Sequence, residues 1–261
     1  MVGREISNMF AEKQNEIGEV LLDVRQLNNG THVRDVSFQL HKGEILGFAG
    51  IMGSGRTEPL RCVFGLDTAE SGEIWLDGQQ LKIRNARDAI SNGIMMATES
   101  RKDDELVLCR SIRENMTLPS LYRTARGGII NKKKEKEIVG NFSGKLRIKT
   151  ASLETMANSL SGGNQQKVIL CKWLMMNPKV LIVDEPTRGI DIGAKTEIYH
   201  IMAELAAQGV GIIVISSDME EVIGVSDRIL VMCEGRISGC LPKEEVTQER
   251  IMELASEVET A

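Results

Sequence analysis

Residues 50–57 read Gly50-Ile51-Met52-Gly53-Ser54-Gly55-Arg56-Thr57, and this stretch decides the fold class. It matches the phosphate-binding pattern GxxxxGK[ST] at every fixed position except the lysine, which here is arginine. Glycines let successive backbone N–H groups turn inward around a phosphate, because no side chain blocks the approach. The expected context, a buried strand before the loop and a helix after it, is present in the hydrophobic pattern.

Two residues at the end of this loop refine the prediction. Thr57 is placed to put its hydroxyl on a magnesium ion. Arg56 keeps the positive charge of the usual lysine, but it is a planar fork rather than a compact ammonium. We therefore expect phosphate binding to be retained and the catalytic geometry to suffer. A glycine-rich turn without a ligand is the alternative that the loop alone leaves open.

A second motif follows an apolar strand at Val180–Val183, which ends in Asp184 and Glu185. This is the Walker B pattern, in which Asp184 helps to hold magnesium and Glu185 polarises the attacking water as a general base. On its own, an apolar strand that ends in two acids is equally compatible with a surface strand end. Its position after the phosphate loop favours the functional interpretation.

A third motif lies between these two, at Leu160-Ser161-Gly162-Gly163-Asn164-Gln165-Gln166-Lys167. Ser161 is a predicted helix N-cap, and the two glycines open the start of the helix to an anion. The motif cannot serve the same phosphate loop without folding back on it. The sequence therefore predicts that it contacts a nucleotide held by another subunit.

The remaining pattern is an alternation of buried strands and helices. Strands are predicted at 20–24, 33–40, 44–49, 93–98, 180–183, 212–215 and 229–232, and helices at 56–64, 163–176, 194–207 and 220–225. Asp77-Gly78 predicts a tight hairpin turn. Residues 99–159 are more charged and predict a mostly helical insertion, with Lys132-Lys133-Lys134 on a solvated face. The alternation predicts an α/β fold with a mainly parallel sheet covered on both faces.

Composition excludes several classes of protein. The 261 residues carry 32 Lys and Arg against 37 Asp and Glu, and this mildly acidic balance does not favour a nucleic-acid-binding face. No apolar run approaches the roughly 20 residues that span a bilayer, and the first twenty residues lack the apolar region of a secretory signal. The five cysteines form no CxxC pair, which favours reduced thiols over a zinc site or disulfides. The three histidines lack metal-ligand spacing.

The third motif resembles the signature motif of ATP-binding cassette (ABC) ATPases, and the order of phosphate loop, helical insertion, signature, Walker B and D-loop is the same. More narrowly, the chain is similar to importers of the ribose, galactose, xylose and arabinose type. The similarity is carried by the strings at 53–58, 99–102, 161–168 and 184–191, and it covers roughly residues 20–245.

The resemblance implies a RecA-like P-loop NTPase core with an antiparallel β subdomain and a helical subdomain at about 99–160. It implies a cassette at 20–245, a linker or tail at 1–19 and a C-terminal helix at 246–261. Those importers usually carry two cassettes in tandem, and this sequence resembles the second one.

The resemblance also implies that two cassettes share their nucleotides head to tail. Gly50 to Thr57, Asp184 and Glu185 would form this chain's half of one site. Ser161, Gly162, Gly163 and Gln165 would complete the partner's site, and Asp191 matches the D-loop aspartate. Three positions depart from the family pattern: Arg56 stands for the usual lysine, Glu99 for the Q-loop glutamine, and Ser217 for the switch histidine. No aromatic residue in 20–32 matches the one that stacks on adenine.

The resemblance implies an ATPase that uses ATP and Mg²⁺ and couples hydrolysis to monosaccharide import. Its partners would be a second cassette (the N-terminal half of the same protein or a second copy), transmembrane permease subunits and, indirectly, a sugar-binding protein. It would work at the cytoplasmic face of the membrane. A regulatory cassette that binds ATP with little hydrolysis remains an alternative. A DNA-repair or ribosomal ATPase is disfavoured, because the insertion is short and lacks sustained heptads.

Overall fold

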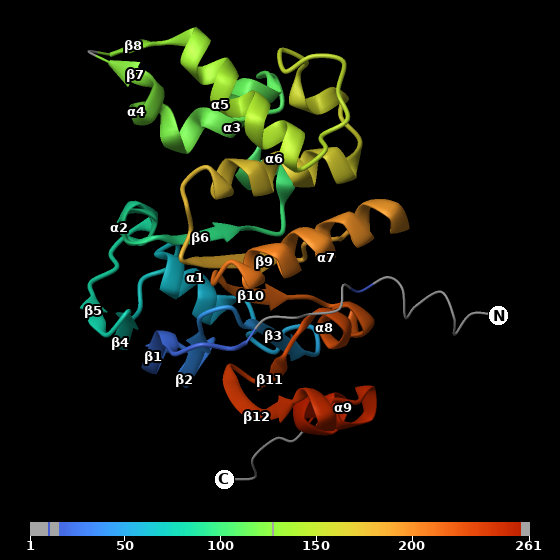
Figure 1. Ribbon diagram of the computed structural model, residues 1–261. Coiled ribbons are helices and arrows are strands. Elements are labelled where there is room, and N and C mark those ends of the chain that lie inside the picture. The colour runs from blue at the N-terminus through green and yellow to red at the C-terminus, as the bar shows by residue number, and fades with distance from the viewer. Residues whose placement is uncertain (1–9, 11–15, 127, 257–261) are drawn as a thin grey trace, which may run out of the picture.

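The computed structural model describes residues 10, 16–126 and 128–256, and a six-stranded sheet forms its centre (Figure 1). The strand order is β12-β11-β3-β10-β9-β6, and every neighbouring pair is parallel except β11 with β12. The bounds are β3 (Ile45–Gly50), β6 (Ile94–Ala97), β9 (Val180–Asp184), β10 (Gly211–Ile215), β11 (Arg228–Cys233) and β12 (Arg236–Pro242). The predicted mainly parallel sheet is confirmed.

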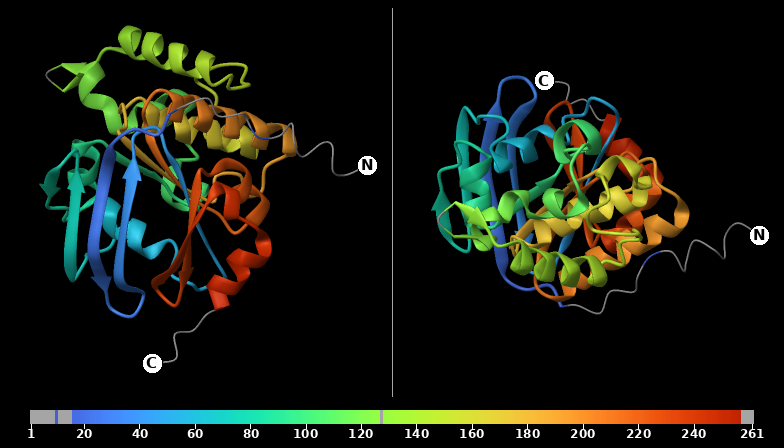
Figure 2. Two further views of the ribbon diagram at one scale, coloured as in Figure 1. Left: turned by 60° about the horizontal axis from the view of Figure 1, so that its bottom comes forward. Right: turned by 90° about the horizontal axis from the view of Figure 1, so that it is seen from above.

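A second, fully antiparallel sheet lies beside the first and has the order β2-β1-β4-β5 (Figure 2). It consists of β1 (Val20–Asn29), β2 (Val33–His41), β4 (Ser71–Leu76) and β5 (Gln79–Leu81). The expected hairpin turn at Asp77-Gly78 joins β4 to β5, and both turn residues have positive φ. This sheet is the expected antiparallel β subdomain, and it contacts the central sheet through β2, which lies against β10 and β12.

Helices cover the central sheet on both faces, as expected for buried parallel strands. They are α1 (Glu58–Phe64), α2 (Ala86–Asn92), α6 (Gly162–Leu174), α7 (Ile192–Ala207), α8 (Met219–Val225) and α9 (Gln248–Ser256). Helix α6 packs against β6 and α7 packs against β10, whereas α8 and α9 pack against β3. Strands β9 and β10 are fully buried, and so are Met95 and Met96 of β6.

The segment between β6 and α6 is mostly helical and projects beyond α6 in Figure 1. It holds a π-helical turn (Arg101–Glu105), α3 (Ile112–Thr117), α4 (Leu121–Thr124), α5 (Lys132–Lys145) and short 3₁₀ turns at Leu118–Ser120 and Ala157–Ser159. A two-stranded hairpin, β7 (Ala125–Arg126) with β8 (Ile129–Ile130), was not expected. A capping box between Ser111 and Glu114 starts α3, and Asn131 caps α5.

Several elements differ from the sequence prediction in their bounds or were missed. Helix α1 begins at Glu58 rather than Arg56, because Gly53 and Gly55 have φ values of 81° and 85° and keep the loop out of the helix. Strand β12 was missed, since Gly239 and the terminal Pro242 interrupt its pattern. The last helix begins at Gln248, after a 3₁₀ turn at Lys243–Glu245, rather than at residue 246.

The expected tail at 1–19 lies largely outside the described residues. Within it, Phe10 stacks on Tyr199 of α7 with ring centroids 5.1 Å apart.

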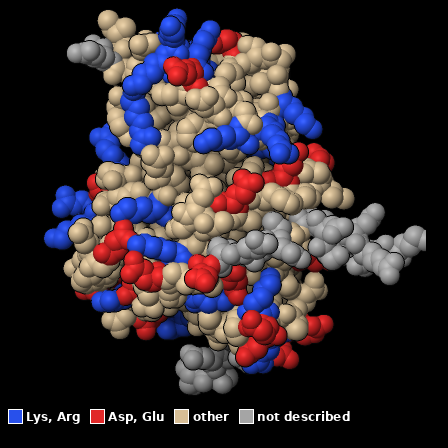
Figure 3. Space-filling view, viewed as in Figure 1, with Lys and Arg blue, Asp and Glu red and all other residues tan. Residues whose placement is uncertain are grey.

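In the described part of the chain, no helix combines the length and the apolar character needed to cross a bilayer. Figure 3 shows Lys and Arg gathered over the helical insertion, and the expected solvated residues Lys132, Lys133 and Lys134 are exposed there.

Candidate nucleotide-binding site

The phosphate loop lies between β3 and α1, at the carboxyl end of the central parallel strands, where α/β proteins bind ligands. Two glycines of the loop are required because other parts of the chain lie directly against them. A Cβ on Gly50 would lie 2.3 Å from Ser54 Oγ and 2.7 Å from the carbonyl of Met232. A Cβ on Gly55 would lie 2.9 Å from the carbonyl of His32, in the loop between β1 and β2. These two positions therefore accept only glycine without a shift of the backbone.

The outer side of the loop is open, and its interior holds an unsatisfied polar atom. A Cβ on Gly53 would meet nothing within 4 Å, and Ile51 and Met52 are exposed. The hydroxyl of Ser54 is buried and has no hydrogen-bond partner in the described structure. A buried unpaired hydroxyl costs free energy unless a ligand or water satisfies it. The loop therefore fits the phosphate groups that its sequence predicts.

Arg56 joins the phosphate loop to the end of β9. Its Nη1 donates to the carbonyl of Gly50 at 2.6 Å, and its Nη2 lies 3.4 Å from Oε1 of Glu185. The side chains of Arg56 and Glu185 are 17% and 8% exposed. The planar fork thus makes two contacts at once, which the single ammonium of a lysine could not make with the same geometry.

Asp184 lies beside Thr57, as the predicted magnesium site requires. Its side chain is buried, and burial together with the neighbouring charge of Glu185 raises its pKa to about 7, against the opposing hydrogen bond from Thr57. A carboxylate that burial disfavours as an ion is stabilised by a cation bound to it. No group of three or more His, Cys, Asp and Glu side chains forms a metal site in the described residues. A cation would therefore use Thr57, Asp184 and the phosphates.

Glu185 contacts Ser217, the switch position, through the backbone of Ser217. The N–H of Ser217 donates to Oε1 of Glu185 at 2.7 Å, and the N–H of Glu185 donates to the carbonyl of Ile215 at 2.8 Å. Glu185 has a φ of 48°, a strained value for a non-glycine residue and one that recurs at functional sites. The structure therefore orients Glu185 without an imidazole at position 217.

A buried carboxylate connects the two sides of this region. Glu221 of α8 accepts hydrogen bonds from the hydroxyls of Thr187 (2.6 Å) and Ser216 (2.5 Å). Burial raises the pKa of Glu221, against the lowering effect of these donors. The segment after Glu185 is thereby tied to the segment that carries Ser217. Sequence reasoning did not find this residue, because its partners lie on other elements.

The signature residues lie at the start of α6, but they do not all face the same way. Ser161 is exposed at the N-cap position, where its hydroxyl accepts from Asn164 Nδ2 (2.9 Å) and makes no capping bond. Gly163 packs against α7, since a Cβ there would lie 2.5 Å from Cβ of Ala194. Gln165 is 5% exposed and donates to the carbonyl of Ala157 at 3.1 Å. Within this chain the Gln165 side chain therefore faces inward, and its expected contact with a partner's nucleotide stays a prediction.

Signature and D-loop residues share one hollow of about 190 Å³. It is lined by residues of both motifs and their neighbours, among them Ser161, Gly163, Asn164, Asp191 and Ala194, and by no residue of the phosphate loop. Asp191 is exposed and caps α7 by accepting from the N–H of Ala194 at 3.0 Å. The signature residues therefore line a hollow separate from the chain's own phosphate loop, and their contact with a nucleotide of another subunit stays a prediction.

The Q-loop position contacts the segment after Walker B. Glu99 forms an ion pair with Arg188, and both side chains are at least half exposed. Two residues later, Nη1 of Arg101 donates to the carbonyl of Gly162, in the signature, at 3.0 Å. The sequence prediction noted Arg101 within a family string but gave it no role.

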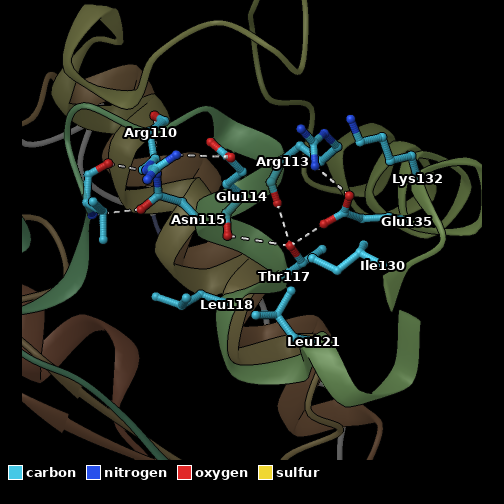
Figure 4. A pocket seen from close by; sticks show the side chains of 11 residues that line it. Arg110, Arg113, Glu114, Asn115, Thr117, Leu118, Leu121, Ile130, Lys132 and Glu135 are labelled. Carbon is cyan, nitrogen blue, oxygen red and sulfur yellow. Dashed lines mark hydrogen bonds and ion pairs between the residues drawn. The ribbon is translucent and has the colours of Figure 1, made fainter. Parts of the chain in front are cut away.

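A further cavity of about 400 Å³ lies within the helical insertion, away from the phosphate loop (Figure 4). Arg113 and Glu135 form an ion pair on its wall, and Thr117 donates to Glu135 at 2.8 Å. Leu118 and Ile130 are exposed at its rim. This cavity holds none of the predicted nucleotide-site residues.

Comparisons with known proteins agree with this geometry. The chain is 50% identical over 256 residues to the ribose import ATP-binding protein RbsA of Bacillus licheniformis, which covers 98% of this chain and 52% of that protein. It is also 50% identical to a putative ribose/galactose/methyl galactoside import ATP-binding protein of Pseudomonas fluorescens, over 98% of this chain and 50% of that protein. The chain thus spans about half the length of these relatives.

Solved structures show the same fold. The chain matches cbiO1 from Clostridium perfringens, part of the ABC transporter complex cbiONQ, with a TM-score of 0.74 and 22% identity over 89% of this chain and 92% of that one. It also matches a dimeric, post-hydrolysis ATP-binding cassette bound to ADP and Pi, with a TM-score of 0.71 and 19% identity over 85% of this chain and 99% of that one. The family pattern described as ABC transporter matches residues 33–188. The chain therefore belongs to the ABC transporter family and has the fold of its ATP-binding cassettes.

Proposed function

We propose that this chain binds Mg-ATP at residues 50–57 and hydrolyses it. One observation carries the proposal: the folded chain brings the phosphate loop, Asp184 and Glu185 together across 129 residues of sequence, with Arg56 in contact with Glu185. The unpaired Ser54 hydroxyl and the open side of Gly53 support phosphate binding. The 50% identity to import ATP-binding proteins supports ATP as the nucleotide.

The chemistry follows from the positions of these residues. Backbone N–H groups of the loop and the charge of Arg56 hold the phosphates. Thr57 and Asp184 would hold Mg²⁺, which neutralises charge that develops on the phosphates. Glu185 orients and deprotonates the attacking water, and the N–H of Ser217 fixes its carboxylate.

We further propose that a working site needs a second cassette, either the N-terminal half of a longer protein or a second copy of this chain. Ser161 and Gly163 line one hollow with Asp191 and with no residue of the chain's own phosphate loop, and Gly162 lies between them in the sequence. They would contact the nucleotide of the partner, and Asp191 would lie at the interface. Gln165 would support the signature from within.

The transported substrate and the membrane partners belong to the same proposal. Relatives with 50% identity bear names of ribose or galactose import proteins, which supports a monosaccharide as the substrate. Transmembrane permease subunits would contact the helical insertion and the Glu99 segment, at the cytoplasmic face of the membrane. An extracytoplasmic sugar-binding protein would deliver the substrate. Arg56 and Ser217, which depart from the usual motifs, support assignment as the second of two cassettes.

A regulatory cassette is the second candidate function. Here the chain would hold ATP with little turnover and lend its signature to the partner. Two observations favour it. The guanidinium of Arg56 contacts the carboxylate of Glu185, and position 217 contacts that carboxylate through a backbone N–H rather than an imidazole.

The test is Mg-ATP turnover by the purified chain at low and high protein concentration, with Glu185→Gln as the control. Turnover that rises more steeply than linearly with concentration, and is lost in the control, supports hydrolysis by paired copies. Turnover equal to that of the control, with retained ATP binding, supports the regulatory cassette. Absence of Mg-ATP binding, with the chain folded, would refute both functions.

A further inference from the structure

One guanidinium lies where three nucleotide-site motifs meet. Arg101, two residues after Glu99, donates through Nη1 to the carbonyl of Gly162 in the signature (3.0 Å). Its Nη2 lies 3.5 Å from where a Cβ on Gly189 would stand, in the segment between Walker B and the D-loop. A Cβ on Gly162 would also lie 3.1 Å from the carbonyl of Gly189. The glycines allow these backbone segments to approach each other and the guanidinium.

The surroundings of Arg101 explain why its guanidinium bonds to the backbone of Gly162. The guanidinium is partly buried, and burial lowers the pKa of Arg101. The hydrogen bond from its Nη1 goes to a backbone carbonyl rather than to an acid. A partly desolvated charge costs free energy, so its position is explained by the backbone segments that it joins rather than by a surface ion pair.

Both ends of the same segment are anchored. At its start, Glu99 pairs with Arg188, three residues after Glu185. At its end, the carboxylate of Glu105 is buried and accepts from Lys172 and Trp173, both on the signature helix α6. The π-helical turn Arg101–Glu105 therefore connects the Walker B side to both ends of α6. Single π-helical turns are often found at functional sites.

We propose that Arg101 is a positioning residue that holds the signature of this chain in register with its own Glu99 and Walker B segments. Because the signature serves the partner's nucleotide in the proposed function, on which this inference rests, Arg101 couples the two composite sites. Arg56 contacts Glu185, and Glu99 pairs with Arg188 three residues later. A shift of the Walker B segment would thus reach Glu99, and Arg101 would carry it to Gly162. Arg101 itself touches neither nucleotide.

The test isolates the partner's site. This chain carries Glu185→Gln, which silences its own site, and it is assembled with a partner cassette whose Walker B motif is intact. We expect Arg101→Met to lower the remaining turnover by about tenfold or more, the factor contributed by one charge-assisted hydrogen bond. Lys102→Met is the matched control, since this neighbouring lysine is exposed on the same turn. ATP affinity of this chain alone should change by less than about threefold in both variants, because neither residue lines the phosphate loop.

A double-mutant cycle distinguishes positioning from general damage. In a Ser161→Ala background, Arg101→Met should cause little further loss of turnover, because both changes act on the signature. Equal losses for Arg101→Met and Lys102→Met, or independent losses in the cycle, would overturn the inference. If the parent chain neither binds ATP nor supports turnover by the partner, the proposed function fails first, and that result is distinct from the failure of Arg101 alone.

Discussion

At the scale of single residues, Arg56 is the departure with the clearest chemical consequence. Its guanidinium bonds to Gly50 and contacts the same oxygen of Glu185 that accepts from the N–H of Ser217. In the proposed function, the attacking water would have to compete with this fork for the carboxylate. The arginine therefore keeps a positive charge for phosphate while it restrains the residue proposed as the general base.

We predict that Arg56→Lys raises Mg-ATP turnover by about threefold or more, because a lysine releases Glu185 and retains the charge. Arg56→Ala should weaken Mg-ATP binding by about tenfold or more, as expected for the loss of a charge-assisted hydrogen bond. Steady-state turnover and equilibrium nucleotide binding measure the two effects. A lysine variant that binds ATP but turns over no faster than wild type would show that Arg56 does not restrain Glu185.

At the scale of elements, the junction between the helical insertion and α6 depends on a buried ion pair. Lys172 of α6 contacts the carboxylate of Glu105 and donates to its carbonyl at 2.9 Å, and the two side chains are 7% and 3% exposed. The N–H of Thr98 donates to the other carboxylate oxygen at 2.9 Å. Such a pair is costly to break on one side, because the remaining charge stays buried.

We predict that Lys172→Met lowers the free energy of unfolding by about 3–5 kcal/mol. The matched change Lys136→Met should cost less than about 1 kcal/mol, because that lysine is 61% exposed and lies 3.7 Å from Glu154. Urea denaturation followed by circular dichroism measures both. Replacing Glu105 by Leu in the Lys172→Met variant should recover part of the loss. Similar costs for the two lysines would contradict the assignment of a buried pair.

The elements themselves were largely predictable, and the misses have local causes. Continuous apolar runs identified β9 and β10, because strands buried on both faces carry apolar residues at every position. The β7–β8 hairpin and β12 were missed, since two-residue strands and a strand with glycine and proline carry too little periodicity.

At the scale of the whole molecule, the exposure of each cysteine thiol reports how the surrounding chain packs. All five cysteines are free, as the sequence predicts; Cys62, Cys171 and Cys233 are buried, and Cys109 and Cys240 are exposed. Burial raises the pKa of all three buried thiols. A thiol reacts as its thiolate, so both low access and raised pKa slow these three.

We predict that a thiol reagent labels two cysteines rapidly in the native protein and all five after denaturation. Mass spectrometry of the labelled protein counts the modified sites. The variant Cys109→Ser should reduce the rapid count by one and leave the total in denaturant lower by one. Rapid labelling of Cys171, at the centre of α6, would contradict the packing of the signature helix.

The sequence by itself determined the fold class and the positions of the phosphate loop, Walker B and signature motifs. These depend on local requirements: glycines where the backbone must turn at positive φ, apolar runs in buried strands, and acids at a strand end. Only the tertiary structure decided that Gln165 faces inward, that Arg56 contacts Glu185, and that Arg101 bonds to Gly162. The physical reason is that these contacts join separate elements, and their closeness is set by how helices and sheets pack rather than by local pattern.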